Sequence, residues 1–555
     1  MLRSTCNVAV LLICRLAAAA AVPDDLGVAI KLNDYLAVRN SASAFLSPIA
    51  PDFHRDLPDN WLGSALQCGS IDCINQKGDV CFTCFDTPRG PAWACVAPIR
   101  SAEFYLDSLR ANLGHETMSG EAYSFIVKSK TPAGVPEQTR TFVRVANGTV
   151  VFSRDEQTCS AAADMLKTGS LAQLFAKDDS SISIYLKGGF VSKHREKVIA
   201  WLIGLPLISI VSAESAGTLE RMHLLCDAVL ASGEQVEHVQ AGVRIRPEGV
   251  GLHARITPRE GTLLARFMAN QQPASADLLS MLPGHPVFAC RGRAAGLQDV
   301  EDAYVALKGR LAAASPGDAP SDLQHALERI HRFAVNNGGH FASALVLPPP
   351  DQFGIEYLRA YEMKNAAAAK ADLVWEMAAV KAQPLAAEKL ADADVLGWRI
   401  SKHGKFTELR AAFTGNLMLI ASGPASAANL AQMIGLARLQ PGDPPKDAVT
   451  QARSFAAAMA AVKPAPPERP AAMVFFSLTA LLNLGGSSGK PGMESLRRVQ
   501  PTSGLTAWVT PDSPKPAAGA VPFTVRISIP ADELIVIRET ILGDIPLLEL
   551  DLPAE

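Results

Sequence analysis

The chain has 555 residues, of which 48% are hydrophobic and 19% charged, and its 52 basic and 55 acidic side chains leave a net charge of -3. This composition is typical of a packed globular protein with two or three domains, and it excludes a disordered chain. The basic residues are scattered along the sequence without a stripe or cluster, which argues against nucleic-acid binding.

Residues 1–21 have the pattern of a secretory signal peptide. Arg3 supplies the positive charge, an apolar stretch follows from residue 8 to 13, and small residues precede an expected cleavage point near Ala21. Cys14 stands where a lipid could be attached, but Ile13 occupies a position that requires a small residue, so we expect cleavage rather than lipidation. The mature protein is therefore expected to be periplasmic or secreted.

A second apolar run covers residues 198–213. It is about 16 residues long, shorter than the roughly 20 needed to cross a bilayer, and Pro206 interrupts it. The run predicts a buried helix that leads into a core strand. We therefore expect no transmembrane segment after signal cleavage.

Residues 22–87 are expected to form a separate lead segment that carries cysteines. In an exported chain, crowded cysteines predict disulfides, and four of them could close two bridges in three ways. Two other interpretations stay open: a zinc site built from two cysteine pairs, and a redox dithiol in the Cys-x-x-Cys spacing of residues 81–84. The crowded cysteines are Cys68, Cys73, Cys81, Cys84 and Cys95.

Similar segments then recur along the chain, which predicts an internal duplication. A strand at 91–96 resembles one at 286–291, which places Cys95 and Cys290 at matching positions; both are expected to be buried strand residues, and they stay disulfide candidates because a bridge between them is left open. Helix-period segments follow at 102–113 and 300–311. Next come alternating strands at 123–128 and 397–402, each followed by a hairpin that turns at Asn147-Gly148 or near Gly415-Asn416. Helices at 160–166 and 426–436 and closing strands at 252–258 and 523–530 complete both copies.

The predicted fold class is therefore α+β, with two copies of an antiparallel sheet-plus-helix unit at residues 88–283 and 284–555. The spacing between matched segments widens within the second copy, which predicts a helical insertion at about 312–394. Helices are expected there at 321–335 and 355–382. The insertion is either a partner-facing surface or a cap that completes packing.

Residues 282–289 (LPGHPVFA) combine a leucine-proline pair with an alternating strand. This segment resembles the repeat opening of exported bacterial proteins made of tandem domains of unknown function. The resemblance extends over residues 88–545. It implies export and an α+β repeat, and it supplies no catalytic residues.

The patterns of common catalytic sites are not met. Residues 485–489 (GGSSG) match a hydrolase spacing, but that chemistry needs a later histidine and the last one is His403. We expect no catalytic residues, metal ligands or cofactors. The predicted function is a non-catalytic binding or assembly protein of the bacterial cell envelope, with an unknown protein or envelope partner. The alternatives are a hydrolase-like enzyme with a site between the repeats, and a thiol-redox or metal-binding module at residues 68–84.

Overall fold

The computed structural model describes residues 22–50, 56–68, 70–119, 121–130, 136–175, 179–196, 232–269, 278–293, 302, 304–306, 308–309, 331–332, 339–348, 356–402, 405–439, 447–461, 470–486, 502–512 and 521–543. The chain divides into two compact units, the first with residues 1–247 and 252–258 and the second with residues 248–251 and 259–555. Residues 1–21, the apolar run at 198–213 and most of the helices expected at 300–311 and 321–335 lie outside the described residues.

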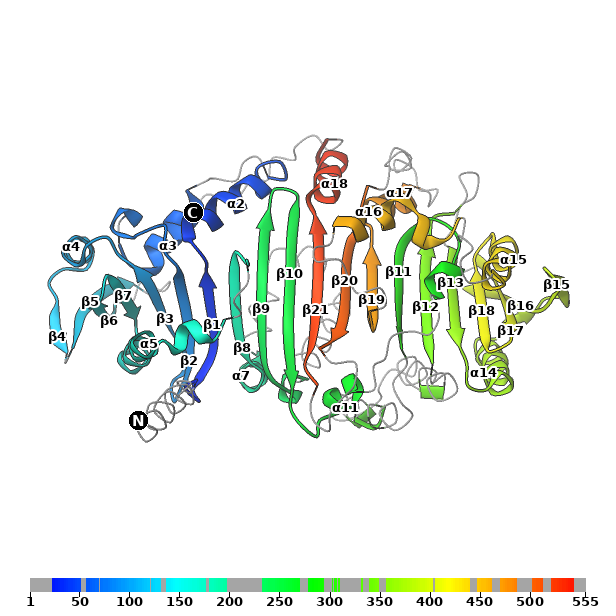
Figure 1. The fold of residues 1–555 in the computed structure, drawn as a ribbon, viewed down its shortest axis with the longest axis horizontal. Coiled ribbons are helices and arrows are strands. Elements are labelled where there is room, and N and C mark those ends of the chain that lie inside the picture. Colours follow the sequence, from blue (N-terminus) through cyan, green and yellow to red (C-terminus); the bar gives the residue numbers. More distant parts are fainter. Residues whose placement is uncertain are drawn as a thin grey trace, which may run out of the picture. The chain divides into compact units, whose positions relative to one another are not determined.

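Unit 1 is built on an antiparallel sheet with the strand order β4-β5-β6-β7-β3-β2-β1-β8-β9-β10 (Figure 1). The hairpin between β6 and β7 turns at Asn147 and Gly148, with φ of 51° and 71°, as the sequence predicts. The strands are β1 (Leu26–Leu32), β2 (Val80–Thr87), β3 (Gly90–Pro98), β4 (Thr117–Ser119), β5 (Ala122–Lys130), β6 (Pro136–Ala146), β7 (Thr149–Ser153), β8 (Ile182–Lys187), β9 (Val236–Arg246) and β10 (Gly249–Pro258).

Helices cover both faces of this sheet, because successive strand residues point to opposite sides and buried apolar residues occupy both of them. One face packs on α2 (Tyr35–Leu46), α3 (Leu57–Ala65) and α4 (Ala102–Leu113), and the other on α5 (Glu156–Thr168) and α6 (Ser170–Gln173). The bounds of α4 are those that the periodicity predicts, and Ser101 caps its first turn. The shorter elements are η1 (Ile71–Cys73), α7 (Gly188–Lys193) and η2 (Ser232–Gln235).

Unit 2 has the strand order β16-β17-β18-β13-β12-β11-β19-β20-β21, with the short strands β14 and β15 both paired to β16. The strands are β11 (Pro286–Arg293), β12 (His340–Val346), β13 (Glu356–Glu362), β14 (Gln383–Pro384), β15 (Glu388–Leu390), β16 (Ala393–Lys402), β17 (Lys405–Thr414), β18 (Leu417–Ser422), β19 (Ala472–Phe476), β20 (Leu505–Pro511) and β21 (Phe523–Pro530).

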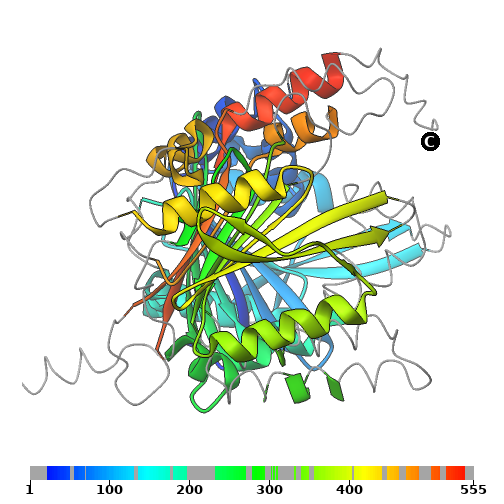
Figure 2. The ribbon, with the colours of Figure 1, turned by 90° about the vertical axis from the view of Figure 1, so that its right-hand side faces the viewer.

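Helices α14 (Ala366–Ala379) and α15 (Ser426–Ala437) lie on opposite sides of the strands of unit 2, as Figure 2 shows. Helix α16 (Arg453–Ala461) joins α15 in the larger core cluster. The remaining described elements are α11 (Leu263–Ala269), η3 (Leu278–Met281), η4 (Val449–Gln451), α17 (Leu478–Gly486) and α18 (Ala531–Gly543).

The strand orders of the two units agree when β1 is set against β11. β11 pairs with β12 and β19 just as β1 pairs with β2 and β8. The sequence match of β3 with β11 is therefore wrong, since these strands hold different places in their sheets. Equivalent positions in the two units can be found by counting residues from the hairpins that lead into β7 and β18. On this count, Cys95, which pairs with Phe152, is equivalent to Arg359, which pairs with Ile420. Cys95 is therefore not equivalent to Cys290.

Two expectations about segment boundaries are also wrong. Residues 22–87 are not separate from the first sheet, because they supply β1 and β2. Residues 312–394 are not a helical insertion, because they contain β12 and β13, and the helix expected from residue 355 begins only at Ala366. In β13 the side chains of Leu358 and Ala360 are buried and those of Tyr357 and Arg359, which alternate with them, are less so, which is strand rather than helix periodicity.

Candidate functional site

One face of the sheet in unit 1 carries a continuous row of side chains. Ile30 on β1 lies opposite Phe82 on β2, Phe82 lies opposite Cys95 on β3, and Cys95 lies opposite Phe152 on β7. Directly opposed residues on neighbouring strands share a face, so these four side chains line up across four strands. Trp93, two residues before Cys95, points to the same face.

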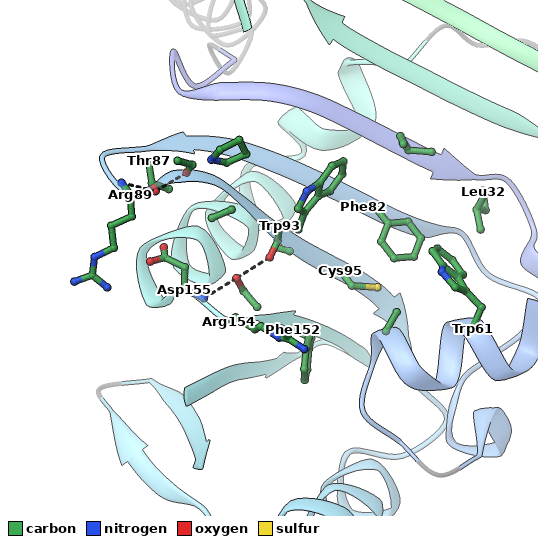
Figure 3. A pocket seen from close by; sticks show the side chains of 17 residues that line it. Leu32, Trp61, Phe82, Thr87, Arg89, Trp93, Cys95, Phe152, Arg154 and Asp155 are labelled. Carbon is green, nitrogen blue, oxygen red and sulfur yellow. Dashed lines mark hydrogen bonds between the residues drawn. The ribbon is translucent and has the colours of Figure 1, made fainter. Parts of the chain in front are cut away.

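Helix α3 forms a wall beside this row. Leu62 within the helix and Leu66 at its C-terminal end are fully buried in the core, and this burial fixes the helix against the sheet. Trp61 is 56% exposed and projects over the row, where its ring contacts Phe82 with the centroids 5.2 Å apart. Figure 3 shows Trp61, Phe82 and Trp93 arranged along the strands.

The row of side chains on the sheet and helix α3 border an open pocket of about 770 Å³. Its lining is mainly apolar, and Trp93 is 50% exposed in it. Large aromatic side chains left in contact with water at a concave surface are typical of a binding site, because covering them with an apolar ligand is favourable. We refer to this pocket as the aromatic groove.

Two cations stand at the aromatic groove. Arg89 lies in the turn between β2 and β3, and Arg154 lies between β7 and α5. Among the residues that the structure describes, neither guanidinium has an ion pair. The nearby carboxylate of Asp155 is occupied as the cap of α5, where it accepts a hydrogen bond from the backbone of Thr158 at 2.8 Å. With two arginines and one carboxylate among its lining residues, the groove has a net positive charge.

The other side of α3 borders a second pocket, of about 700 Å³, with a polar lining. In this lining, the carboxylate of Asp59 accepts hydrogen bonds from the Tyr35 hydroxyl at 2.9 Å and from the Arg39 guanidinium at 2.5 Å. Cys68 also lines this space. We refer to it as the polar pocket. Helix α3 thus separates an apolar space from a polar one.

The predicted cysteine site is not assembled as a unit. The described cysteines are all free thiols: Cys68, Cys73, Cys81, Cys84, Cys95, Cys159 and Cys290. Cys81 and Cys84 both lie in β2, three positions apart, so they point to opposite faces and their Cα atoms are roughly 10 Å apart. A bridge between them requires less than about 7 Å, which rules out the Cys-x-x-Cys redox interpretation.

Burial makes most of these thiols unreactive. It raises the pKa of Cys81, Cys84 and Cys159 to about 12, and it also raises the pKa of buried Cys95. Within the described part of the chain, no group of three potential ligands is placed to hold a metal ion. The thiols of Cys68 and Cys73 donate hydrogen bonds to the backbone carbonyls of Gly63 and Ser70.

Sequence reasoning missed the residues of the aromatic groove. From the sequence, Trp93 is only part of a predicted strand, and no role is predicted for Trp61, Arg89 or Arg154. Tryptophans on an α-helix and a strand ordinarily indicate core positions, and only the tertiary structure shows that both remain half-exposed.

Comparisons with known proteins add no assignment: no family model, no curated protein and no solved structure matches this chain. Among the described residues, no helix is both long enough and apolar enough to span a membrane.

Proposed function

We propose that the chain is an exported, non-catalytic binding protein of the bacterial cell envelope, and that its aromatic groove takes an apolar ligand bearing an anionic group. The observation that carries the proposal is that two half-exposed tryptophans, Trp61 and Trp93, share a pocket with Arg89 and Arg154, two cations that form no ion pair with the residues that the structure describes.

The apolar part of the ligand supplies most of the binding free energy. Covering exposed apolar surface contributes roughly 25 cal/mol per Å², and each tryptophan offers a large flat ring at small cost in side-chain entropy. The anionic part gives orientation, because an arginine guanidinium forms paired hydrogen bonds with a carboxylate, sulfonate or phosphate. Either a free amphiphile or an acidic, apolar chain end has this chemistry.

The export and repeat parts of the proposal have separate support. The charged, apolar and small-residue stretches of residues 1–21 favour export. The agreement of strand order between the two units favours descent from a duplicated α+β unit, with β1 equivalent to β11. The resemblance to exported tandem-domain proteins is consistent with both.

A titration of the full chain with anilinonaphthalenesulfonate, an aromatic sulfonate that fluoresces when it leaves water, tests the proposal. We expect saturable binding, competed by dodecanoate. The Trp93→Ala variant is expected to weaken it at least about tenfold, the loss of roughly 1.4 kcal/mol. Phe406→Ala, which removes a 66% exposed ring of unit 2, is the matched control and is expected to change nothing.

A second arm separates charge from apolar contact. The double variant Arg89→Gln/Arg154→Gln is expected to weaken dodecanoate binding severalfold while leaving binding of uncharged dodecanol unchanged. Equal affinity of Trp93→Ala and the unmodified protein for the sulfonate would overturn the proposed site. Equal loss of dodecanoate and dodecanol in the double variant would overturn its preference for an anion.

A further inference from the structure

The aromatic groove has different chemistry at its two ends. Its floor follows strand β3, where Pro91, Trp93 and Cys95 alternate onto one face of the sheet and all line the pocket. Arg89 lies in the turn that precedes this strand, and Trp61 belongs to helix α3. Figure 3 shows Arg89 and Trp61 at opposite ends of the groove, with Trp93 between them. The groove therefore has a cationic end and an apolar end.

Both arginines of the lining belong to the cationic end. Arg154 directly follows β7, and the pairing of β7 with β3 brings it level with Trp93. Arg89 lies beyond Pro91 in the turn between β2 and β3. The carboxylate of Asp155 in the same part of the lining is engaged as the cap of α5. A negatively charged group at the level of Pro91 therefore lies between the positions of two guanidinium groups.

The apolar end is formed where helix α3 lies over β1 and β2. Phe82 is paired with Ile30, and Leu32 lies two residues further along β1, away from the turn that holds the arginine. The ring of Trp61 contacts that of Phe82, and Ala65, one helical turn after Trp61, also lines the groove. All the charged residues of the lining belong to the other end, so this end suits a hydrocarbon.

The distance between the two ends sets the length of the ligand. Pro91 and Cys95 are four strand positions apart, and Leu32 lies two positions further on, so at about 3.4 Å per position the groove is roughly 20 Å long. Carbon–carbon bonds of about 1.5 Å at tetrahedral angles advance a straight chain by about 1.25 Å per carbon. A saturated chain of about sixteen carbons therefore extends from Pro91 to the level of Leu32.

We infer that the groove binds one molecule of a long-chain fatty acid, with its carboxylate at Arg89 and Arg154 and its tail directed toward helix α3. The inference rests on the proposed function, and it adds the ligand class, the orientation and a residue that limits chain length, Ala65. A free volume of about 770 Å³ is in the range of sites that hold one small ligand. Each methylene that the groove buries contributes up to about fourfold in affinity.

A chain-length series with the full chain tests the inference. Octanoate, dodecanoate, hexadecanoate and eicosanoate are titrated against bound anilinonaphthalenesulfonate, below the concentrations at which these acids form micelles. We expect affinity to rise at least about tenfold for each step of four carbons up to hexadecanoate, because each step buries further methylenes. Between hexadecanoate and eicosanoate we expect no further gain, because the added carbons lie beyond the groove.

Substitutions at two alanines separate chain length from general affinity. Ala65→Leu fills part of the apolar end and is expected to weaken hexadecanoate binding at least about tenfold, while octanoate, whose tail ends near Cys95, binds unchanged. Ala111→Leu adds the same side chain at an exposed position of α4 outside the groove, and as the matched control it is expected to change neither acid. The double variant Arg89→Gln/Arg154→Gln is expected to weaken both acids by the same factor.

These measurements distinguish failure of this inference from failure of the proposed function. A flat chain-length series, which needs no variant, overturns the inference, and so does an equal loss of octanoate and hexadecanoate in Ala65→Leu. Sulfonate binding that depends on Trp93 would still support the proposed function in both cases. Vesicles of diacyl phosphatidylglycerol that displace the sulfonate as well as hexadecanoate does would overturn the single-chain ligand. Absence of saturable binding of the sulfonate and of every acid overturns both.

Discussion

The indole ring of Trp61 packs against the phenyl ring of Phe82, with centroids 5.2 Å apart and planes inclined by 51°. The tilted contact joins helix α3 to strand β2 at the aromatic groove. Phe82 is partly buried and packs on the core cluster, whereas Trp61 is 56% exposed. One ring of the pair therefore belongs mainly to the fold and the other is available to a ligand.

This difference predicts opposite outcomes for two alanine substitutions. Phe82→Ala is expected to lower the free energy of unfolding by about 2 kcal/mol, because it leaves a space between β2 and α3. Trp61→Ala is expected to cost less than about 1 kcal/mol in stability, while binding of anilinonaphthalenesulfonate falls severalfold. Urea unfolding and the fluorescence titration measure the two effects. Similar stability losses in both variants would contradict the division of roles.

Glu356 is fully buried in unit 2 and accepts hydrogen bonds from the backbone of Ala425 at 2.7 Å and from Asn429 at 2.9 Å. Burial raises its pKa, so the folded state holds the proton more tightly than the unfolded chain. Between the unfolded and the raised folded pKa, stability is therefore expected to fall as the pH rises, and to recover on acidification.

Glu356→Ala is expected to cost about 3 kcal/mol at neutral pH, because both donors at the start of α15 lose their partner. Glu356→Gln keeps one acceptor and is expected to cost less, and it removes this carboxyl from the pH dependence. Urea unfolding at a series of pH values measures both changes. An unchanged pH profile in the glutamine variant would contradict the assignment.

Alanine substitutions at two helical glycines are expected to change the stability of the protein in opposite directions. A Cβ on Gly188, at the start of α7, would collide with the backbone oxygens of Val236 and Gly233, which cannot move without shifting η2 and β9. Gly188→Ala is therefore expected to cost about 2 kcal/mol or more. Gly435 in α15 has open space around its missing Cβ, so Gly435→Ala is expected to stabilise by about 0.5–1 kcal/mol. Thermal unfolding of the two variants measures these shifts.

Local patterns along the chain determine the type of most elements and the bounds of several. Helix α4, with its cap at Ser101, and the hairpin at Asn147 and Gly148 depend on neighbouring residues only, so periodicity and turn chemistry predict them. The mixed α+β class follows from the same local signals.

Only the tertiary structure decides which strand lies beside which. β3 and β11 have similar sequences but hold different places, because strand order is set by pairing between residues far apart in the chain. The thiols of Cys81 and Cys84, three positions apart in the sequence, are separated by the pleat of β2, whereas Cys68 and Cys73 belong to one buried core cluster. The half-exposure of Trp61 and Trp93 likewise depends on how α3 lies over the sheet. Hydrophobic residues serve a core and a binding groove equally well, and packing alone decides which of the two they form.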